Sequence, residues 1–213
     1  MLLALVAALT VAQPELLDRT LALVGGQPIT LSDARAAVAL GLIDDPKNSL
    51  ADVTARLVDR ELVLREVQRY APPAPAESAV EARLADVRKR LADSLTRVLA
   101  VHGFSEARLR AWIRDDLRTQ AYLAQRFASA SLPSDAEVAA AYARQRVEFD
   151  KSGVSFEQAA PLIRQRLIDE RRRELIVDWV ADLRRRTDVV IIEQAPDAPD
   201  APDAPDAPDA PAT

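Results

Sequence analysis

Few residues of this chain are of the types that carry out catalysis. The 213 residues include no cysteine and a single histidine, His102. A cysteine nucleophile, a disulfide scaffold and a zinc ribbon are therefore excluded, and any histidine-based mechanism would have to use that one imidazole. Because His102 precedes Gly103 after a long amphipathic stretch, we expect it near the C-terminal end of a helix, where it complements exposed carbonyl groups. The sequence predicts no catalytic residue, no metal ligand and no cofactor.

The aromatic side chains suit a different chemistry, the transient binding of unfolded polypeptide. Such binding needs exposed apolar surface rimmed by charge, and arginine, which greatly outnumbers lysine here, stacks on aromatic rings and binds backbone carbonyls. The candidate peptide-binding residues are aromatic and belong to the later helices of the chain: Trp112, Tyr122, Phe127, Tyr142, Phe149 and Trp179. Each of them could instead fill the core, and the sequence leaves both interpretations open.

Charge patterning argues against a nucleic-acid partner. Two arginine runs, 171–173 and 184–186, have acidic residues interleaved with them, which favours a solvated helix face with ion pairs between successive turns. Without the aspartates of the C-terminal repeat, acidic and basic residues balance. No overall field therefore attracts nucleic acid or anionic lipid.

Both ends of the chain differ in composition from its middle. The uncharged apolar run at the N-terminus is too short to span a bilayer, and it is typical of a secretory signal peptide over 1–12; a short buried helix is the alternative, because no basic residue precedes the run. Residues 195–213 repeat Ala-Pro-Asp and have nothing to bury, so we expect a disordered or extended tail, either a solubilising spacer or a partner-docking arm. The sequence thus predicts a periplasmic or secreted protein without an integral membrane span.

The middle of the chain has the pattern of helices separated by glycine and proline. Apolar residues recurring at three and four positions, bounded by capping residues such as Thr30, Ser49, Ser134 and Ser155, predict helices. We expect these helices over 31–40, 50–70, 77–101, 106–128, 135–149, and from Ser155 or Pro161 to 186. Residues 20–24 and 28–30 flank Gly25-Gly26 as a hairpin, and the β-branched run 188–192 has no neighbour in sequence with which to pair. We therefore expect a mainly α domain closed by a small sheet of the N-terminal hairpin and the C-terminal strand.

Three stretches of the chain carry a resemblance to a known family. Asp18 to Thr30, DRTLALVGGQPIT, resembles the opening "D-x-I-x-A-x-V-N-G-x-x-I-T" of the SurA-type periplasmic chaperones and the related PrsA-like foldases, with Gly25 where the family usually has asparagine. Residues 57–67, LVDRELVLREV, are similar to the second signature of that N-terminal domain. Residues 163–192 resemble the helix and strand that close the chaperone core. The similarity covers about 17–192, mostly through hydrophobic patterns.

The resemblance implies a SurA-N-like multi-helix fold and the binding of unfolded exported or outer-membrane proteins. Family members often carry parvulin-type prolyl isomerase domains between the two parts of the core, whereas here only the turn around Gly153 separates 17–150 from 155–192. Isomerase activity is therefore not implied. Two other functions stay open: a non-enzymatic helical adaptor that docks a folded envelope partner, and a prolyl isomerase with an unrecognised site. The sequence does not determine the oligomeric state.

Overall fold

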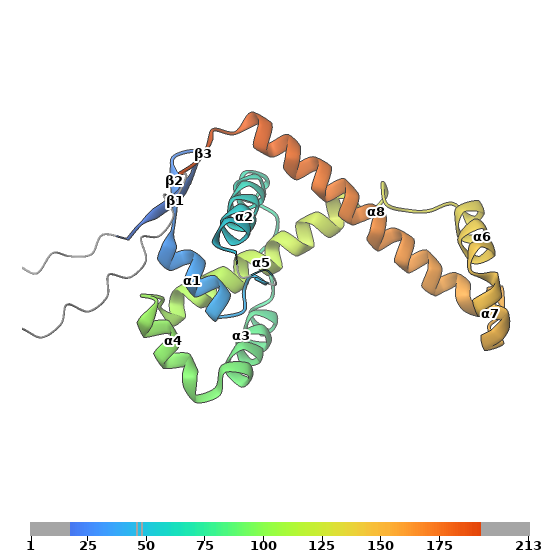
Figure 1. Ribbon diagram of the computed structural model, residues 1–213, viewed down its shortest axis with the longest axis horizontal. Helices are drawn as coiled ribbons and strands as arrows, with labels where there is room; N and C mark the ends of the chain where they lie inside the picture. Colours follow the sequence, from blue (N-terminus) through green and yellow to red (C-terminus); the bar gives the residue numbers. More distant parts are fainter. Residues whose placement is uncertain (1–17, 46, 48, 193–213) are drawn as a thin grey trace, which may run out of the picture.

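The computed structural model describes residues 18–45, 47 and 49–192, so the signal peptide and the tail predicted at the two ends lie outside the described residues. The described chain forms a helical body with a small sheet at one end, and a smaller helical arm that projects from this body (Figure 1). The predicted fold class, mainly α with a sheet that joins the N-terminal hairpin to a C-terminal strand, is confirmed.

The sheet consists of three antiparallel strands in the order β2-β1-β3. Strands β1 (Thr20–Val24) and β2 (Gln27–Thr30) form the hairpin, and β3 (Val189–Ile191) pairs with the other side of β1. Gly25 and Gly26 both have positive φ, 52° and 84°, which a tight two-residue hairpin turn requires. The predicted pairing of the C-terminal strand with the hairpin is confirmed, so residues far apart in sequence close the body.

Helices α1 (Leu31–Ala39) and α2 (Leu50–Tyr70) follow the hairpin and begin where their capping residues predict. Thr30 forms a capping box at the start of α1, and the Ser49 hydroxyl accepts a backbone N–H in the first turn of α2. Helix α2 ends at Tyr70, and its C-terminal capping residue, Ala71, adopts a left-handed conformation with φ 46° before a pair of prolines. Because α2 contacts the sheet, α1, α5 and α8, it is the central helix of the body.

The prediction of one continuous helix over 77–101 is wrong. The chain forms α3 (Glu77–Leu91), one 3-10 turn (Ala92–Ser94) and a second helix, α4 (Leu95–Val101). Ala92 has a φ of 42°, which interrupts the regular α-helical geometry. Nothing in the apolar spacing signals this break, because the hydrophobic residues on either side of it keep a helical period.

The interruption keeps α4 against the core of the body. Leu95 and Leu99 are 9% and 8% exposed and belong to the same apolar cluster as residues of α1, α3 and α5. The Ser94 hydroxyl donates a 2.5 Å hydrogen bond to the carbonyl of Leu91, which lies at the end of α3. His102 is the C-terminal capping residue of α4, as predicted.

The last part of the chain forms α5 (Glu106–Arg126) in the body and three further helices that make the arm and its connection. These are α6 (Asp135–Arg144), α7 (Arg146–Ser152) and α8 (Phe156–Arg186). The helix predicted over 135–149 is therefore wrong in its length, because it ends at Arg144 and a short helix follows. Helix α8 begins at the Ser155 capping box and continues through Pro161.

Helix α8 belongs to both parts of the molecule. Its first half packs on α6 through the small apolar cluster Val138, Ala141, Ala159 and Ile163, which forms the core of the arm. Its second half lies on the body, where Trp179 and Leu183 join the cluster that also contains residues of the sheet and α2 (Figure 1). The arm and the body thus have separate apolar cores connected by one helix.

Candidate functional site

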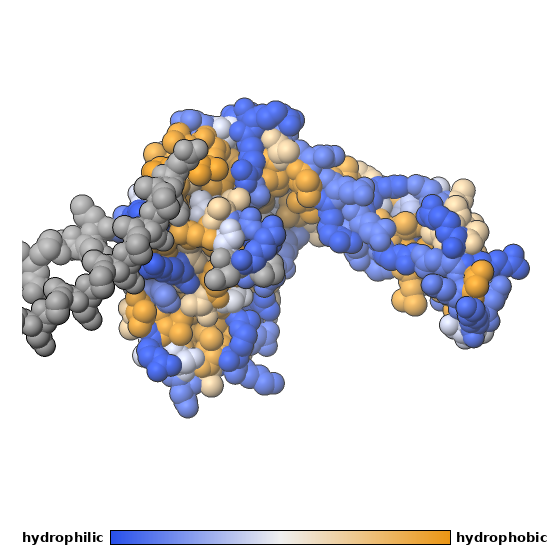
Figure 2. All heavy atoms as spheres, in the orientation of Figure 1, coloured by the Kyte–Doolittle hydropathy of each residue, from blue (hydrophilic) through white to orange (hydrophobic). Residues whose placement is uncertain are grey.

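An apolar groove lies where the second half of α8 crosses α2 and α5. It has a volume of about 630 Å³. Apart from Thr119 of α5 and the charged rim, its lining residues are aliphatic: Val63 of α2, Leu123 of α5, and Ile176, Val177, Val180 and Ala181 of α8. Val63 is buried at 6% exposure, whereas Val177 is 66% exposed. Figure 2 shows hydrophobic side chains where α8 meets the body and mainly hydrophilic ones on the part of α8 leading to the arm.

Charged side chains form the rim of this groove and hold its helices together. Arg184 Nε lies 2.6 Å from Asp59 Oδ1, which joins α8 to α2. Arg184 Nη2 also donates a 3.0 Å hydrogen bond to the carbonyl of Ala55. Both ionic side chains are partly exposed, so water weakens the pair and its main effect is positional.

Arg60 joins the rim of the groove to α5. Its guanidinium carbon lies 3.6 Å from the centroid of the Trp112 ring, and its Nε lies 3.1 Å from Asp116 Oδ1. The Trp112 indole donates a 3.1 Å hydrogen bond to the other oxygen of Asp116. This arrangement holds the tryptophan ring and the arginine in contact with each other at the boundary between the groove and a second pocket.

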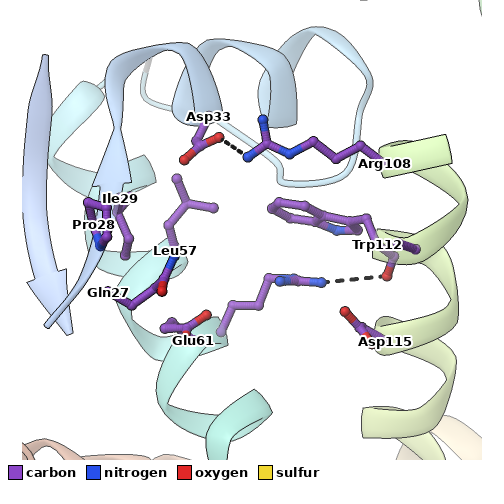
Figure 3. Close-up of a pocket in the computed structure, with 11 residues that line it drawn as sticks. Gln27, Pro28, Ile29, Asp33, Leu57, Glu61, Arg108, Trp112 and Asp115 are labelled. Atoms are coloured by element: carbon purple, nitrogen blue, oxygen red, sulfur yellow. Dashed lines mark hydrogen bonds and ion pairs between the residues drawn. The ribbon is translucent and has the colours of Figure 1, made fainter. Parts of the chain in front are cut away.

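The second pocket is smaller and more charged, with a volume of about 210 Å³ (Figure 3). Arg60 and Trp112 line it, together with β2 residues, Leu57 and Glu61 of α2, and Asp115 of α5. An ion pair between Asp33 and Arg108 crosses its far end. Figure 3 shows the Trp112 ring extending from α5 into the space between α5 and α2.

Two carboxyl groups around the second pocket have shifted pKa values. Burial raises the pKa of Glu61, an effect that the charges of Arg65 and Arg60 oppose. Burial likewise raises the pKa of Asp116 by more than its contact with Arg60 lowers it. A raised pKa is a property of general acids, but burial is the main cause of both shifts, and the neighbouring arginines act in the opposite direction.

The single histidine of the chain lies outside both of these pockets. His102 caps α4 and lines neither the groove nor the second pocket. Within 18–45, 47 and 49–192, no cluster of three or more histidine or acidic side chains is arranged to hold a metal ion.

The structure divides the predicted peptide-binding aromatic residues among three places. Tyr122, Phe127 and Trp179 come together in one buried cluster, where the Trp179 ring centroid lies 6.2 Å from that of Tyr122 and 5.9 Å from that of Phe127. Tyr142 and Phe149 stack with a 5.0 Å centroid distance in the arm and are half-buried.

The remaining candidate, Trp112, is half-buried in the wall of the second pocket. The six aromatic residues do not form one binding surface.

Arginine stacks on aromatic rings within the protein. The Arg126 guanidinium carbon lies 4.9 Å from the Trp179 ring centroid and 5.6 Å from that of Phe127. Like Arg60 over Trp112, this contact covers a ring with the protein's own side chain. Of these two arginines, Arg60 lines the groove and Arg126 does not.

The aliphatic residues of the groove are the ones that sequence reasoning missed. A weak signal was present, since Leu175, Ile176 and Val177 are three consecutive apolar residues on a helix that needs only a narrow apolar stripe to pack on the body. Such a run places at least one side chain outside the packed face. Here that side chain is Val177.

The comparisons with known proteins do not assign a family. No protein-family model matches the chain, and no curated protein matches it. Among the helices in the described part of the chain, none combines the length and apolar character needed to cross a membrane.

Proposed function

We propose that this chain is a SurA-like chaperone core that binds unfolded exported or outer-membrane polypeptides reversibly, in the periplasm or after secretion. In this proposal it has no prolyl isomerase activity. The supporting observation is the aliphatic groove beside α8, which offers continuous apolar surface to solvent next to a charged rim. Apolar surface of this kind on a soluble protein is typical of sites that bind polypeptide.

The dimensions of the groove favour weak, exchangeable binding. A space of about 630 Å³ holds a few side chains, and burying an aliphatic side chain contributes about 1.5–3 kcal/mol. The cost of ordering an unfolded client opposes this gain, so one groove has an affinity in roughly the millimolar range. A chaperone that must release its client needs affinity of this order rather than a tight complex.

The charged rim contributes solubility and position. Arg184 pairs with Asp59, and Arg60 pairs with Asp116. Each charged residue of the rim therefore has a partner of opposite charge, and the rim does not attract clients of one particular charge. Selection by the groove is therefore based on apolar character. This property suits varied unfolded chains better than one folded partner with a fixed charge pattern.

The experiment compares two valine substitutions in an aggregation assay. Val177→Asp places a carboxylate in the groove, and Val101→Asp places one on a surface of α4 that does not line it; the two valines are 66% and 71% exposed. Valine and aspartate have similar helix propensity, so both variants should fold. Light scattering from two unrelated unfolded proteins is measured with each variant. We expect the native protein and Val101→Asp to suppress aggregation, and Val177→Asp to lose most of this effect.

Other outcomes separate the alternative functions. An adaptor would leave the aggregation of both clients unchanged, which would refute the proposal. Equal loss in both variants would show that the groove is not the binding surface. Acceleration of a proline-limited refolding reaction would instead indicate an isomerase.

A further inference from the structure

The two outer edges of the sheet differ in the backbone groups that they offer. In an antiparallel pair, alternate residues direct their N–H and C=O groups toward the partner strand. On β3, the N–H of Ile192 donates a 3.0 Å hydrogen bond to the carbonyl of Leu21, and the carbonyl of Asp188 accepts a 2.7 Å bond from Gly25. By alternation Val190 also faces β1, so the backbone groups of Val189 and Ile191 point away from the sheet.

The outer edge of β2 is closed by its own residues. The same alternation directs Gln27 and Ile29 toward β1, so Pro28, which lies opposite Leu23, faces outward. Proline has no N–H to offer to another strand. The next residue that could donate, Thr30, already uses its N–H in a 3.3 Å hydrogen bond to Asp33 Oδ2. This edge therefore resists the addition of a strand.

The outer edge of β3 has no such protection among the described residues. No hydrogen bond within 18–45, 47 and 49–192 reaches the outward backbone groups of Val189 or Ile191. The side chains along this edge are apolar and exposed, at 46% for Val190, 52% for Ile191 and 42% for Ile192. In Figure 2 hydrophobic side chains gather at the sheet end of the molecule.

We propose that β3 binds an extended apolar segment of a non-native polypeptide as a fourth strand of the sheet. This inference rests on the proposed function and adds a second mode of client contact, through backbone hydrogen bonds, to the apolar groove. Outward N–H and C=O groups recognise any extended backbone, and the exposed valine and isoleucine side chains favour apolar residues in it. Such recognition is independent of a particular client sequence.

A second copy of this chain is a poorer occupant of the same edge. The strand has three residues and spans about 10 Å, so only Val189 and Ile191 have outward backbone groups. Pairing two such edges buries far less area than the roughly 1,200–2,000 Å² of a stable protein interface. A short edge is suited to a contact that forms and breaks readily.

The first test measures backbone amide exchange by NMR on the full chain. The probe is an eight-residue peptide of alternating valine and threonine, added at increasing concentration. Without peptide, the amide of Val190 should exchange slowly and those of Val189 and Ile191 rapidly. At saturation we expect slow exchange at all three positions. The same peptide N-methylated at every residue should bind at least about tenfold more weakly, because it has no N–H donor on either edge.

A pair of variants provides the second test. Ile191→Pro removes an outward N–H while leaving the hydrogen bonds of β3 to β1, and so gives β3 the same protection that Pro28 gives β2. Ile191→Ala removes the side chain and keeps the N–H. We expect Ile191→Pro to weaken peptide binding about tenfold or more. Ile191→Ala should also weaken peptide binding, but its effect should be severalfold smaller than that of Ile191→Pro.

Three results would overturn the inference. Peptide binding that leaves the amides of Val189 and Ile191 in rapid exchange would place the peptide elsewhere, even if the protein still suppresses aggregation. Slow exchange at both positions in the free monomer would mean that another part of this chain already occupies the edge. Protection that depends on protein concentration, with dimers in sedimentation velocity, would assign the edge to self-association. The aggregation assay with Val177→Asp tests the groove, and so it tests the proposed function separately from the edge of β3.

Discussion

Replacing Leu183 by alanine should measure how much the second half of α8 contributes to the stability of the body. Leu183 is 1% exposed and packs in the cluster that joins α8 to the sheet and α2. The substitution removes three buried carbon groups, which contribute about 0.8 kcal/mol each, and it leaves a cavity. We therefore expect a loss of about 2.5–5 kcal/mol in the free energy of unfolding.

The same helix provides a matched control. Leu162 is 75% exposed on α8, so Leu162→Ala changes the same residue type in the same helix without removing buried surface. We expect it to change the free energy of unfolding by less than about 0.5 kcal/mol. For a chain of this size, Leu183→Ala should lower the melting temperature by roughly 5–20 °C.

The assay is urea unfolding followed by tryptophan fluorescence, supported by circular dichroism. Both tryptophans, Trp112 and Trp179, pack with the apolar clusters of the body, so their emission reports the body rather than the arm. Equal destabilisation by the two alanine variants would refute the reasoning. A loss below about 1 kcal/mol for Leu183→Ala would also refute it, because α8 would then not close the body.

Two further predictions concern pH. Burial raises the pKa of Glu61 above its ordinary value of 4.5. The contribution of this group to the free energy of unfolding is therefore most favourable below pH 4.5, and it decreases as the pH rises through the raised pKa of the folded state. Glu61→Gln should therefore leave the free energy of unfolding at pH 7 unchanged or increase it, as urea titrations at pH 4 and 7 would show; a clear destabilisation at pH 7 would contradict this account. Hydrogen bonds from Ser134, together with Arg171, lower the pKa of Glu137 from 4.5 to about 2, so its contribution to the arm is present above pH 4.5 and is lost as the pH falls toward 2. After correction for the intrinsic pH dependence of amide exchange, the protection of the α6 amides should decrease over that window in the native protein and depend less on pH in Glu137→Gln, whereas identical protection profiles would show that the charge has no role.

Local signals in the sequence predicted most helix boundaries. The capping residues Thr30, Ser134 and Ser155 all form the predicted boxes, because a hydroxyl and an acid or amide three residues later satisfy backbone groups without help from the rest of the fold. The strand near Val190 was predictable for another reason. A β-branched run with no neighbour in sequence needs a partner, and the hairpin was the only other strand pattern.

Features that depend on tertiary packing were not predictable. The break at Ala92 carries no glycine or proline, and it forms because it keeps Leu95 and Leu99 on the core of the body. The groove was missed for a similar reason. Whether Val177 is buried or exposed depends on where α8 crosses α2 and α5, and no pattern within one helix determines that crossing.

The continuity of α8 has a mechanical consequence. A helix of 31 residues is about 47 Å long at 1.5 Å per residue, and it has no hinge loop between the arm and the body. The position of the arm relative to the body is therefore set by the continuous backbone of α8, and a tilt of the arm requires this helix to bend. Under the proposed function, a client that contacts both the arm and the groove must therefore extend along α8.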